Sequence, residues 1–202
     1  MTDVTQRAGV STAAAIIAGG QATRFGGRDK SRLLINGQTI ISRQAAVLQP
    51  LADDLFIVAS QHERFADLPW RVCADRFPGT GVIGAIVTAL ESTDADRVLT
   101  VACDMPFLEA RLLQRLLDLA VGADGAWVRT PDGAEPLLAC YRRQAAPAIR
   151  AAIAAGRLRA AGLDEFLVMR RVDLDELRAF GDPARLLANL NCPEDLSTIQ
   201  NS

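Results

Sequence analysis

The most constraining feature of the sequence is a series of short, continuous apolar runs. Residues 13–18 (AAAIIA) show no polar alternation and end at a pair of glycines. Runs of the same kind occur at 54–60, 71–74 and 97–103. Strands that are buried on both faces have this pattern, because neither face meets water. The four runs therefore predict strands of a parallel sheet that is covered on both sides.

Helix-like stretches separate these runs. Residues 39–48, 81–91 and 109–120 carry apolar side chains that recur every three or four positions, which predicts helices. Because strand and helix alternate, we expect a Rossmann-like three-layer α/β/α sandwich with a mostly parallel sheet. From about residue 124 the rhythm changes to two strand-like runs, GAWVRT and EPLLACYRR, around the turn signal PDGA. They predict a small antiparallel portion of the sheet in the C-terminal half.

The remaining C-terminal residues predict three more elements. We expect an Ala-rich helix over 144–155 with Gly156 as its cap, a strand near FLVMRRV, and a last helix from Pro193. No internal repeat or low-complexity linker divides the chain. We therefore expect one domain over residues 1–202, with two lobes that meet near residue 123.

Composition and charge exclude several classes of protein. The 22 basic and 24 acidic residues give a net charge of −2, so a basic nucleic-acid-binding surface is not expected. The four cysteines lie far apart and form no C-x-x-C pair, which argues against a zinc or redox centre. No apolar stretch reaches the roughly 20 residues of a membrane helix, and the N-terminus lacks the charged start of a signal peptide. We expect a cytoplasmic protein without nucleic-acid or membrane partners.

A glycine-rich, cationic segment follows the first apolar run. In IAGGQATRFGGRDK, residues 17–30, Gly19 and Gly20 end the strand, and Arg24 and Lys30 follow. Backbone N–H groups approach a polyphosphate closely only where side chains are absent, and the two cations would neutralise phosphate charge. The segment has neither the G-K-[ST] of a P-loop nor a G-x-G-x-x-G. It indicates a nucleoside triphosphate site; the alternative is a surface loop whose glycines only form turns.

A second glycine cluster, FPGTGVIGA, precedes the helix predicted at 81–91. Gly79, Gly81 and Gly84 form a G-x-G-x-x-G, and Asp104 follows about twenty residues later, as in a dinucleotide-binding fingerprint. A nicotinamide dinucleotide is therefore an alternative ligand. That fingerprint belongs in a tight strand-to-helix turn, however, whereas residues 75–78 separate the glycines from the strand. We favour a helix N-terminus that comes close to a nucleotide or to a second anionic substrate.

Two aspartates follow predicted strands. Asp104 stands just past the run 97–103, where ligands of open α/β sheets bind, and Pro106 keeps the strand from continuing. A carboxylate there can hold Mg²⁺, which would bridge the phosphates of a bound triphosphate. Asp75 is a second carboxylate at a strand end. The alternative for both residues is that they cap the next helix.

Five segments together resemble one enzyme family. In chain order they are AGGQATRFGGRDK, ADRFPGTGVIGA, CDMPFL, EPLLACY and NLNCPEDL. In this order, and over nearly the whole chain, they resemble the molybdenum cofactor guanylyltransferases of the nucleotidyltransferase superfamily. The ending N-x-N-x-P-E-D-L is the most specific marker for the guanylyl branch. The resemblance implies a nucleotide-binding lobe over about 12–123 and a pterin or acceptor lobe over about 124–202.

The resemblance also implies roles for individual residues. Arg24, Lys30 and Asp104 are the expected catalytic residues, and Asp104 is the expected ligand of the implied cofactor, Mg²⁺. The residues expected to bind GTP are Ile17, Ala18, Gly19, Gly20, Lys30, Asp75, Gly79, Gly81 and Asp104. Those expected on the pterin side are Arg159, Asn189 and Asn191.

The implied reaction is the Mg²⁺-dependent transfer of GMP from GTP to the phosphate of molybdenum-molybdopterin, with release of pyrophosphate. GTP and the molybdopterin cofactor are the expected substrates, and molybdoenzymes or their chaperones are the expected protein partners. The chain departs from the family pattern at Ala59 and Val82. Transfer of a cytidylyl group or transfer to a sugar phosphate therefore stays open, as does a non-catalytic module that binds a nucleotide or cofactor.

Overall fold

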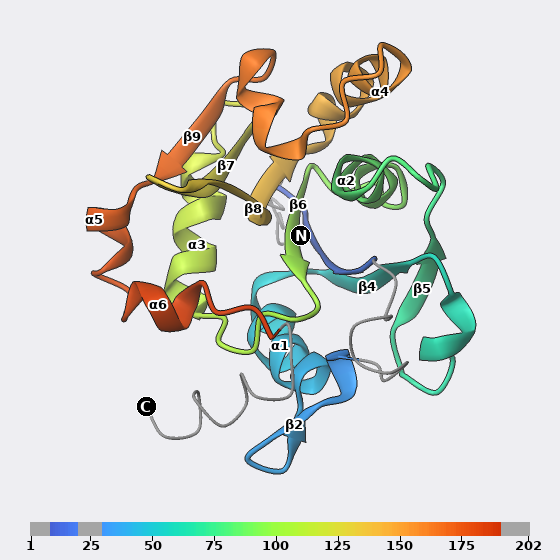
Figure 1. Cartoon of the computed structure of the whole chain (residues 1–202), viewed down its shortest axis with the longest axis vertical. Coiled ribbons are helices and arrows are strands. Elements are labelled where there is room, and N and C mark those ends of the chain that lie inside the picture. The colour runs from blue at the N-terminus through green and yellow to red at the C-terminus, as the bar shows by residue number, and fades with distance from the viewer. Residues whose placement is uncertain (1–8, 20–29, 191–202) are drawn as a thin grey trace, which may run out of the picture.

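A seven-stranded sheet forms the centre of the molecule (Figure 1). The computed structural model describes residues 9–19 and 30–190 of the 202-residue chain. The strand order is β5-β4-β1-β6-β8-β7-β9. The strands are β1 (Thr12–Ala18), β4 (Asp54–Ala59), β5 (Arg71–Ala74), β6 (Arg97–Ala102), β7 (Gly125–Thr130), β8 (Gly133–Arg142) and β9 (Met169–Val172). The four apolar runs predicted as strands are confirmed to within one residue at each end.

Strand directions divide the sheet into two parts. Strands β5, β4, β1 and β6 are mutually parallel, whereas β8 is antiparallel to both of its neighbours, β6 and β7. Strand β9 pairs in parallel with β7. The mostly parallel sheet with a small antiparallel portion in the C-terminal half is therefore confirmed.

Helices cover both faces of the sheet, which confirms the three-layer architecture. The α-helices are α1 (Ile40–Leu48), α2 (Val82–Glu91), α3 (Ala110–Leu119), α4 (Ala146–Ala154), α5 (Leu174–Leu177) and α6 (Pro183–Leu186). Side chains of β1 alternate between two cores: Ala14 and Ile16 pack with α1 and α3, and Ala15 and Ile17 pack with α2 and α4. Because both faces are buried, β1 needs no polar residue in its interior.

A small hairpin before α1 was not expected from the sequence. Strands β2 (Leu34–Ile35) and β3 (Gln38–Thr39) are antiparallel, and Asn36 and Gly37 between them have φ angles of 51° and 81°. Two successive positive φ angles are typical of the Asn-Gly turn that joins short hairpins. Thr39 then caps α1, since its side chain accepts a hydrogen bond from the Ser42 amide at 3.2 Å.

The C-terminal half follows the prediction in its main elements. Helix α4 ends at Ala154, and Gly156 has a φ of 74°. The Gly156 amide donates to the Ile153 carbonyl, and the Arg157 amide donates to the Ala152 carbonyl, both at 2.9 Å. These bonds satisfy helix-end carbonyls, as expected for a glycine cap. The helix predicted from Pro193 lies outside the described residues.

The described residues also form short 3-10 helices: η2 (Lys30–Arg32), η3 (Gln49–Leu51), η4 (His62–Phe65), η5 (Arg143–Ala145) and η6 (Ala160–Glu165). Among the described residues, no helix has the length and apolar character needed to cross a membrane.

Candidate active site

The candidate site lies at the edge where the parallel strands end. Strand β1 stands between β4 and β6, so the chain leaves β1 to one side and later returns on the other. Ligands of open α/β sheets bind in the crevice that such a reversal of strand order creates at the carboxyl ends of the strands. The segments after β1, β5 and β6 carry the candidate residues Gly19, Asp75 and Asp104, and the topology brings these segments to one edge.

Asp104 lies in a tight turn directly after β6. The Cys103 amide donates to the Ile17 carbonyl at 3.1 Å, which joins this turn to the end of β1. The Met105 amide donates back to the Ala102 carbonyl at 3.2 Å and closes the turn. The Asp104 side chain is half-buried at this position. The backbone around Asp104 is therefore fixed at the strand end on both sides of this residue.

Gln44, a residue that the sequence analysis did not select, supports the same turn from α1. Its side-chain amide donates to the carbonyls of Ala102 at 2.7 Å and Met105 at 2.8 Å, which lie on either side of Asp104. Gln44 is only 1% exposed. Its spacing along α1 could have identified it in the sequence, because Gln44 shares the buried face of this helix with apolar residues such as Ile41 and Leu48. A polar residue on an apolar face is worth explaining, since buried polar groups need partners.

Asp75 organises the loop that follows β5. Its amide donates to the Ala59 carbonyl at 3.1 Å, and its Oδ1 accepts from the Phe77 amide at 2.9 Å and from the Thr88 hydroxyl at 3.2 Å. The Thr88 hydroxyl also accepts from the Arg76 amide at 3.1 Å. The residue at the N-cap of α2 is Gly81, so Asp75 does not cap this helix. One of its carboxylate oxygens instead fixes its own loop against α2.

Glycine is required at three positions of this loop and of α2 for different structural reasons. Gly79 and Gly81 have φ angles of 84° and 72°, and an added Cβ would meet no atom within 4 Å at either position. Their backbone is therefore open to a ligand next to the first turn of α2, whose unpaired N–H groups favour an anion. At Gly84, in contrast, an added Cβ would lie 2.0 Å from the Thr80 hydroxyl oxygen. Gly84 serves close packing between the loop and the helix.

Gly19 and Ala18 form the accessible end of β1. Ala18 is half-buried, Gly19 is exposed, and an added Cβ at Gly19 would meet nothing within 4 Å. Ile17 differs, because its side chain is buried in the core beside α2 and α4. Gly20, Arg24 and Asn191 lie outside the described residues. Lys30 begins η2, but its side chain also lies outside the described part.

Asn189 reaches the site from the C-terminal half. The Leu190 amide donates to the Asp104 carbonyl at 3.0 Å, and the Leu190 side chain is buried against Ile35 and Ile40. The exposed Asn189 therefore precedes a residue that is fixed directly onto the Asp104 turn. This contact joins two candidate positions that lie 85 residues apart in the sequence.

Arg159 is not brought to Asp104 in the same way. It is exposed and precedes η6, and within the described part of the chain its side chain makes no hydrogen bond or ion pair. Helix η6 packs on the β8 side of the sheet, where its Asp164 pairs with Arg129 at 2.5 Å. The role that the sequence implied for Arg159 stays a prediction.

The β7–β8 hairpin extends past the end of β6. Val101 pairs with Leu138, so the first residues of β8 continue beyond the last residues of β6. Glu135 lies on this overhang, and burial raises the pKa of its carboxyl group. Half-buried carboxyl groups with a shifted pKa are frequent at functional sites. Glu135, which the sequence analysis did not select, thus lies on the part of β8 that extends past the end of β6.

The fold and this edge define a class of protein. A doubly wound sheet with a strand-end carboxylate, an open glycine loop and a helix N-terminus at its switch point is typical of enzymes that bind nucleotides. The family model described as "MobA-like NTP transferase domain" matches residues 14–177. The chain therefore belongs to this family, and it is a nucleotidyltransferase. This membership favours nucleotidyl transfer over the nicotinamide alternative that the second glycine cluster left open.

Individual relatives agree with this assignment. The chain is 36% identical to the "Probable molybdenum cofactor guanylyltransferase" of Chloroflexus aggregans over 92% of this chain and 91% of the relative. It is 32% identical to the "Molybdenum cofactor guanylyltransferase" of Pseudomonas putida over 90% of this chain and 93% of the relative. A similar solved structure is molybdopterin-guanine dinucleotide biosynthesis protein A from Archaeoglobus fulgidus. Its TM-score is 0.77 at 25% identity, with 94% of this chain and 97% of that chain covered.

Proposed function

We propose that the protein transfers GMP from GTP to the terminal phosphate of a molybdopterin-type cofactor and releases pyrophosphate. The observation that carries this proposal is the meeting of Gly19, Asp104 and the segment ending in Leu190 at one edge of the sheet. The names of the Chloroflexus and Pseudomonas relatives support guanylyl transfer to the molybdenum cofactor as the particular reaction.

The nucleotide would bind along the ends of β1 and β5. The open backbone at Gly19, Gly79 and Gly81 suits close approach of phosphates, and the N–H groups of the first turn of α2 favour their negative charge. Asp75 stands in the adjoining loop, near which we place the ribose or base. Arg24 and Lys30 are the cations that we expect to neutralise charge on the departing pyrophosphate.

The residues at the end of β6 fit a Mg²⁺ ion. Mg²⁺ is usually held by one or two carboxylates together with substrate phosphates and waters, so Asp104 beside a triphosphate is a sufficient donor set. No cluster of three or more His, Cys, Asp or Glu residues gathers in the described part of the chain. When bound, the ion would neutralise phosphate charge and help to orient the triphosphate.

The reaction needs no nucleophile from the protein. A phosphate oxygen of the acceptor forms a bond to the α-phosphorus of GTP, and the bond from that phosphorus to the oxygen bridging to the β-phosphate breaks. The attacking phosphate is already ionised near pH 7, so no general base is required. The protein's part is to hold both substrates in line and to stabilise charge on the leaving group. Asn189, Asn191 and Arg159 are the residues that we assign to the acceptor side.

Nucleotide binding to the purified protein tests the proposal first. GTP, CTP, ATP and a nicotinamide dinucleotide should be titrated with and without Mg²⁺ by isothermal calorimetry. We expect selective GTP binding that Mg²⁺ strengthens, followed by GTP-dependent pyrophosphate release when molybdopterin is added. A preference for CTP would contradict guanylyl transfer but leave the mechanism intact. Tight GTP binding without turnover on the acceptor would favour a binding module. A cytoplasmic location and molybdoenzymes or their chaperones as partners remain predictions.

A further inference from the structure

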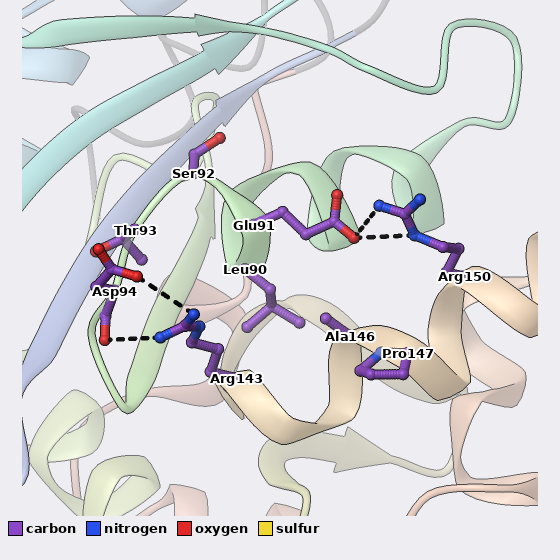
Figure 2. A pocket seen from close by; sticks show the side chains of 9 residues that line it. All are labelled: Leu90, Glu91, Ser92, Thr93, Asp94, Arg143, Ala146, Pro147 and Arg150. Atoms are coloured by element: carbon purple, nitrogen blue, oxygen red, sulfur yellow. Dashed lines mark hydrogen bonds and ion pairs between the residues drawn. The ribbon is translucent and has the colours of Figure 1, made fainter.

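A groove lies between α2 in the N-terminal half of the chain and α4 in the C-terminal half (Figure 2). Two arginines from the C-terminal half cross it. Arg150 on α4 meets Glu91 at the end of α2, and Arg143 on η5 meets Asp94 in the turn before β6. Figure 2 shows the two arginine–carboxylate pairs at opposite ends of the groove, with Leu90 between them. Of the two, the Arg150–Glu91 pair is also in contact with the loop that follows β5.

Glu91 is held between two guanidinium groups. Its Oε1 accepts from Arg150 Nε at 3.0 Å and from Arg150 Nη2 at 2.5 Å. Its Oε2 lies 3.7 Å from Nη1 of Arg76, the residue that directly follows Asp75. The Glu91 side chain is only 17% exposed, so these charges interact more strongly than a fully solvated pair would. Glu91 thus connects α4 to the start of the nucleotide loop.

Arg150 also contacts the loop directly. Its guanidinium carbon lies 5.5 Å from the centre of the Phe77 ring, a cation–π distance. The Phe77 amide donates to Asp75, and the Phe77 carbonyl accepts from the Thr80 amide at 3.2 Å and from the Thr80 hydroxyl at 2.7 Å. Arg150 therefore acts on two successive residues of the loop. It contacts Phe77 directly and reaches Arg76 through Glu91.

We propose that Arg150 is a positioning residue that holds the Asp75–Gly81 loop in the conformation that binds the nucleotide. This inference rests on the proposed function, because it takes that loop to be part of the nucleotide site. Each contact alone is modest, since the Arg150 side chain is itself exposed and water weakens both its ion pair and its cation–π contact. Their position gives them their effect, because the ion pair and the cation–π contact hold the loop from α4, a helix of the acceptor lobe. Nucleotide affinity then depends on how α4 packs against α2.

The Arg143–Asp94 pair supplies a control of the same charge type with a fully exposed carboxylate. Arg143 Nη2 lies 3.2 Å from Asp94 Oδ1, and its Nη1 donates to the Asp94 carbonyl at 3.2 Å. Replacing either arginine by methionine keeps the aliphatic stem but removes the charge and the hydrogen bonds. Arg150→Met breaks the link to the loop, whereas Arg143→Met breaks an arginine–carboxylate pair that is more exposed and does not touch the loop.

The test compares these two variants with the wild type and with Arg150→Lys. In the protein without nucleotide, we expect faster hydrogen exchange at the Phe77 and Thr80 amides in Arg150→Met but not in Arg143→Met. With nucleotide, Arg150→Met should raise the Kd and KM for GTP about 3- to 10-fold with little change in kcat, the size expected when a weak ion pair and a weak cation–π interaction are removed together. Arg150→Lys, which keeps the charge, should recover part of the loss.

Each outcome has a defined meaning. Equal loop exchange and equal GTP affinity in Arg150→Met and Arg143→Met would overturn the positioning role. A loss confined to kcat would also overturn it, because a loop that only binds nucleotide acts through affinity. Faster hydrogen exchange at all amides of Arg150→Met would mean that this variant is destabilised as a whole. In that case the exchange of the loop amides relative to the α3 amides in Arg150→Lys decides whether Arg150 holds the loop. If the wild type fails to bind GTP, the proposed function fails, whereas the exchange comparison without nucleotide still decides whether Arg150 holds the loop.

Discussion

The two parts of the sheet contribute to the site in different ways. In the part formed by β5, β4, β1 and β6, every strand ends at the same edge, so the residues after the strands converge without further arrangement. In the part formed by β8, β7 and β9, the strand next to β6, β8, runs in the opposite direction. This part reaches the edge through a hairpin overhang and through a returning segment, whose Leu190 amide bonds to the Asp104 carbonyl.

The comparison shows what each part is suited for. Parallel strands bring the loops that follow them together by topology alone. Glycine and aspartate residues directly after these strands therefore meet at one edge and can bind a nucleotide. The C-terminal part must instead be fixed by specific contacts, such as those of Leu190 with Asp104 and of Arg150 with Glu91. Substitutions in the two parts should therefore differ in their effects on activity, nucleotide binding and stability. We make four predictions that test this difference.

Asp104→Asn is expected to have the largest effect on activity. The substitution keeps the size of the side chain and leaves the backbone bonds of the turn in place, but it removes the charge that we assign to Mg²⁺. Turnover should fall at least about 100-fold while the free energy of unfolding changes little. Steady-state pyrophosphate release and urea unfolding check this. Asp94→Asn, at the other end of β6, is the control and should keep its activity; near-normal turnover of Asp104→Asn would refute the metal role.

Gly84→Ala should damage both stability and nucleotide binding. The new Cβ would lie 2.9 Å from both the Phe77 Cβ and its carbonyl oxygen, so the loop must move. Overpacking costs about 1–3 kcal/mol, and the better helix propensity of alanine returns up to about 1 kcal/mol. We expect a net loss of stability together with at least about tenfold weaker GTP binding. Calorimetry and chemical unfolding measure the two quantities; unchanged GTP affinity would show that the loop is not part of the site.

Gly19→Ala should separate the same two quantities. An added Cβ meets nothing within 4 Å in the protein, so the free energy of unfolding should stay the same. If phosphates lie against the Gly19 backbone, the methyl group obstructs them, and GTP affinity should fall about tenfold. Titration with GTP and a thermal unfolding curve suffice. A variant that binds GTP normally would remove Gly19 from the nucleotide site.

The smallest effect concerns the core of the C-terminal part. Burial raises the pKa of the Cys140 thiol to about 12, from a usual value of 9.0. The unfolded chain then loses this proton before the folded protein does, so stability is complete below about pH 9 and falls as the pH rises towards 12. The loss is at most about 1.4 kcal/mol per pH unit.

Cys140→Ala should flatten this decline between pH 9 and 10, as followed by urea unfolding at pH 8, 9 and 10. Cys73→Ala, a change at a half-buried thiol, should keep the decline of the wild type. Burial also raises the pKa of the Tyr141 hydroxyl, so a slope above pH 10 should persist in both variants. An unchanged slope in Cys140→Ala would mean that the thiol is not protected by folding.

The sequence predicted the candidate residues of the parallel part better than those of the other part. Gly19, Asp75 and Asp104 could be selected because they directly follow apolar runs, and a strand end is a position that the sequence marks. Gln44 and Glu135 could not be selected by this rule, since neither follows a strand. What distinguishes them depends on the folded structure: two carbonyls accept hydrogen bonds from Gln44, and burial raises the pKa of Glu135.

The amino-acid sequence by itself determined the layers, the order of the main strands and helices, and the family. These properties are local or additive: apolar runs bury themselves, glycines end strands, and motifs stay in order along the chain. Only the tertiary structure decided that Leu190 is fixed to the Asp104 turn, that Gly84 packs whereas Gly79 stays open, and that Arg150 reaches the nucleotide loop. Contacts between distant residues depend on the packing of whole helices, and neither composition nor spacing along the chain encodes that packing directly.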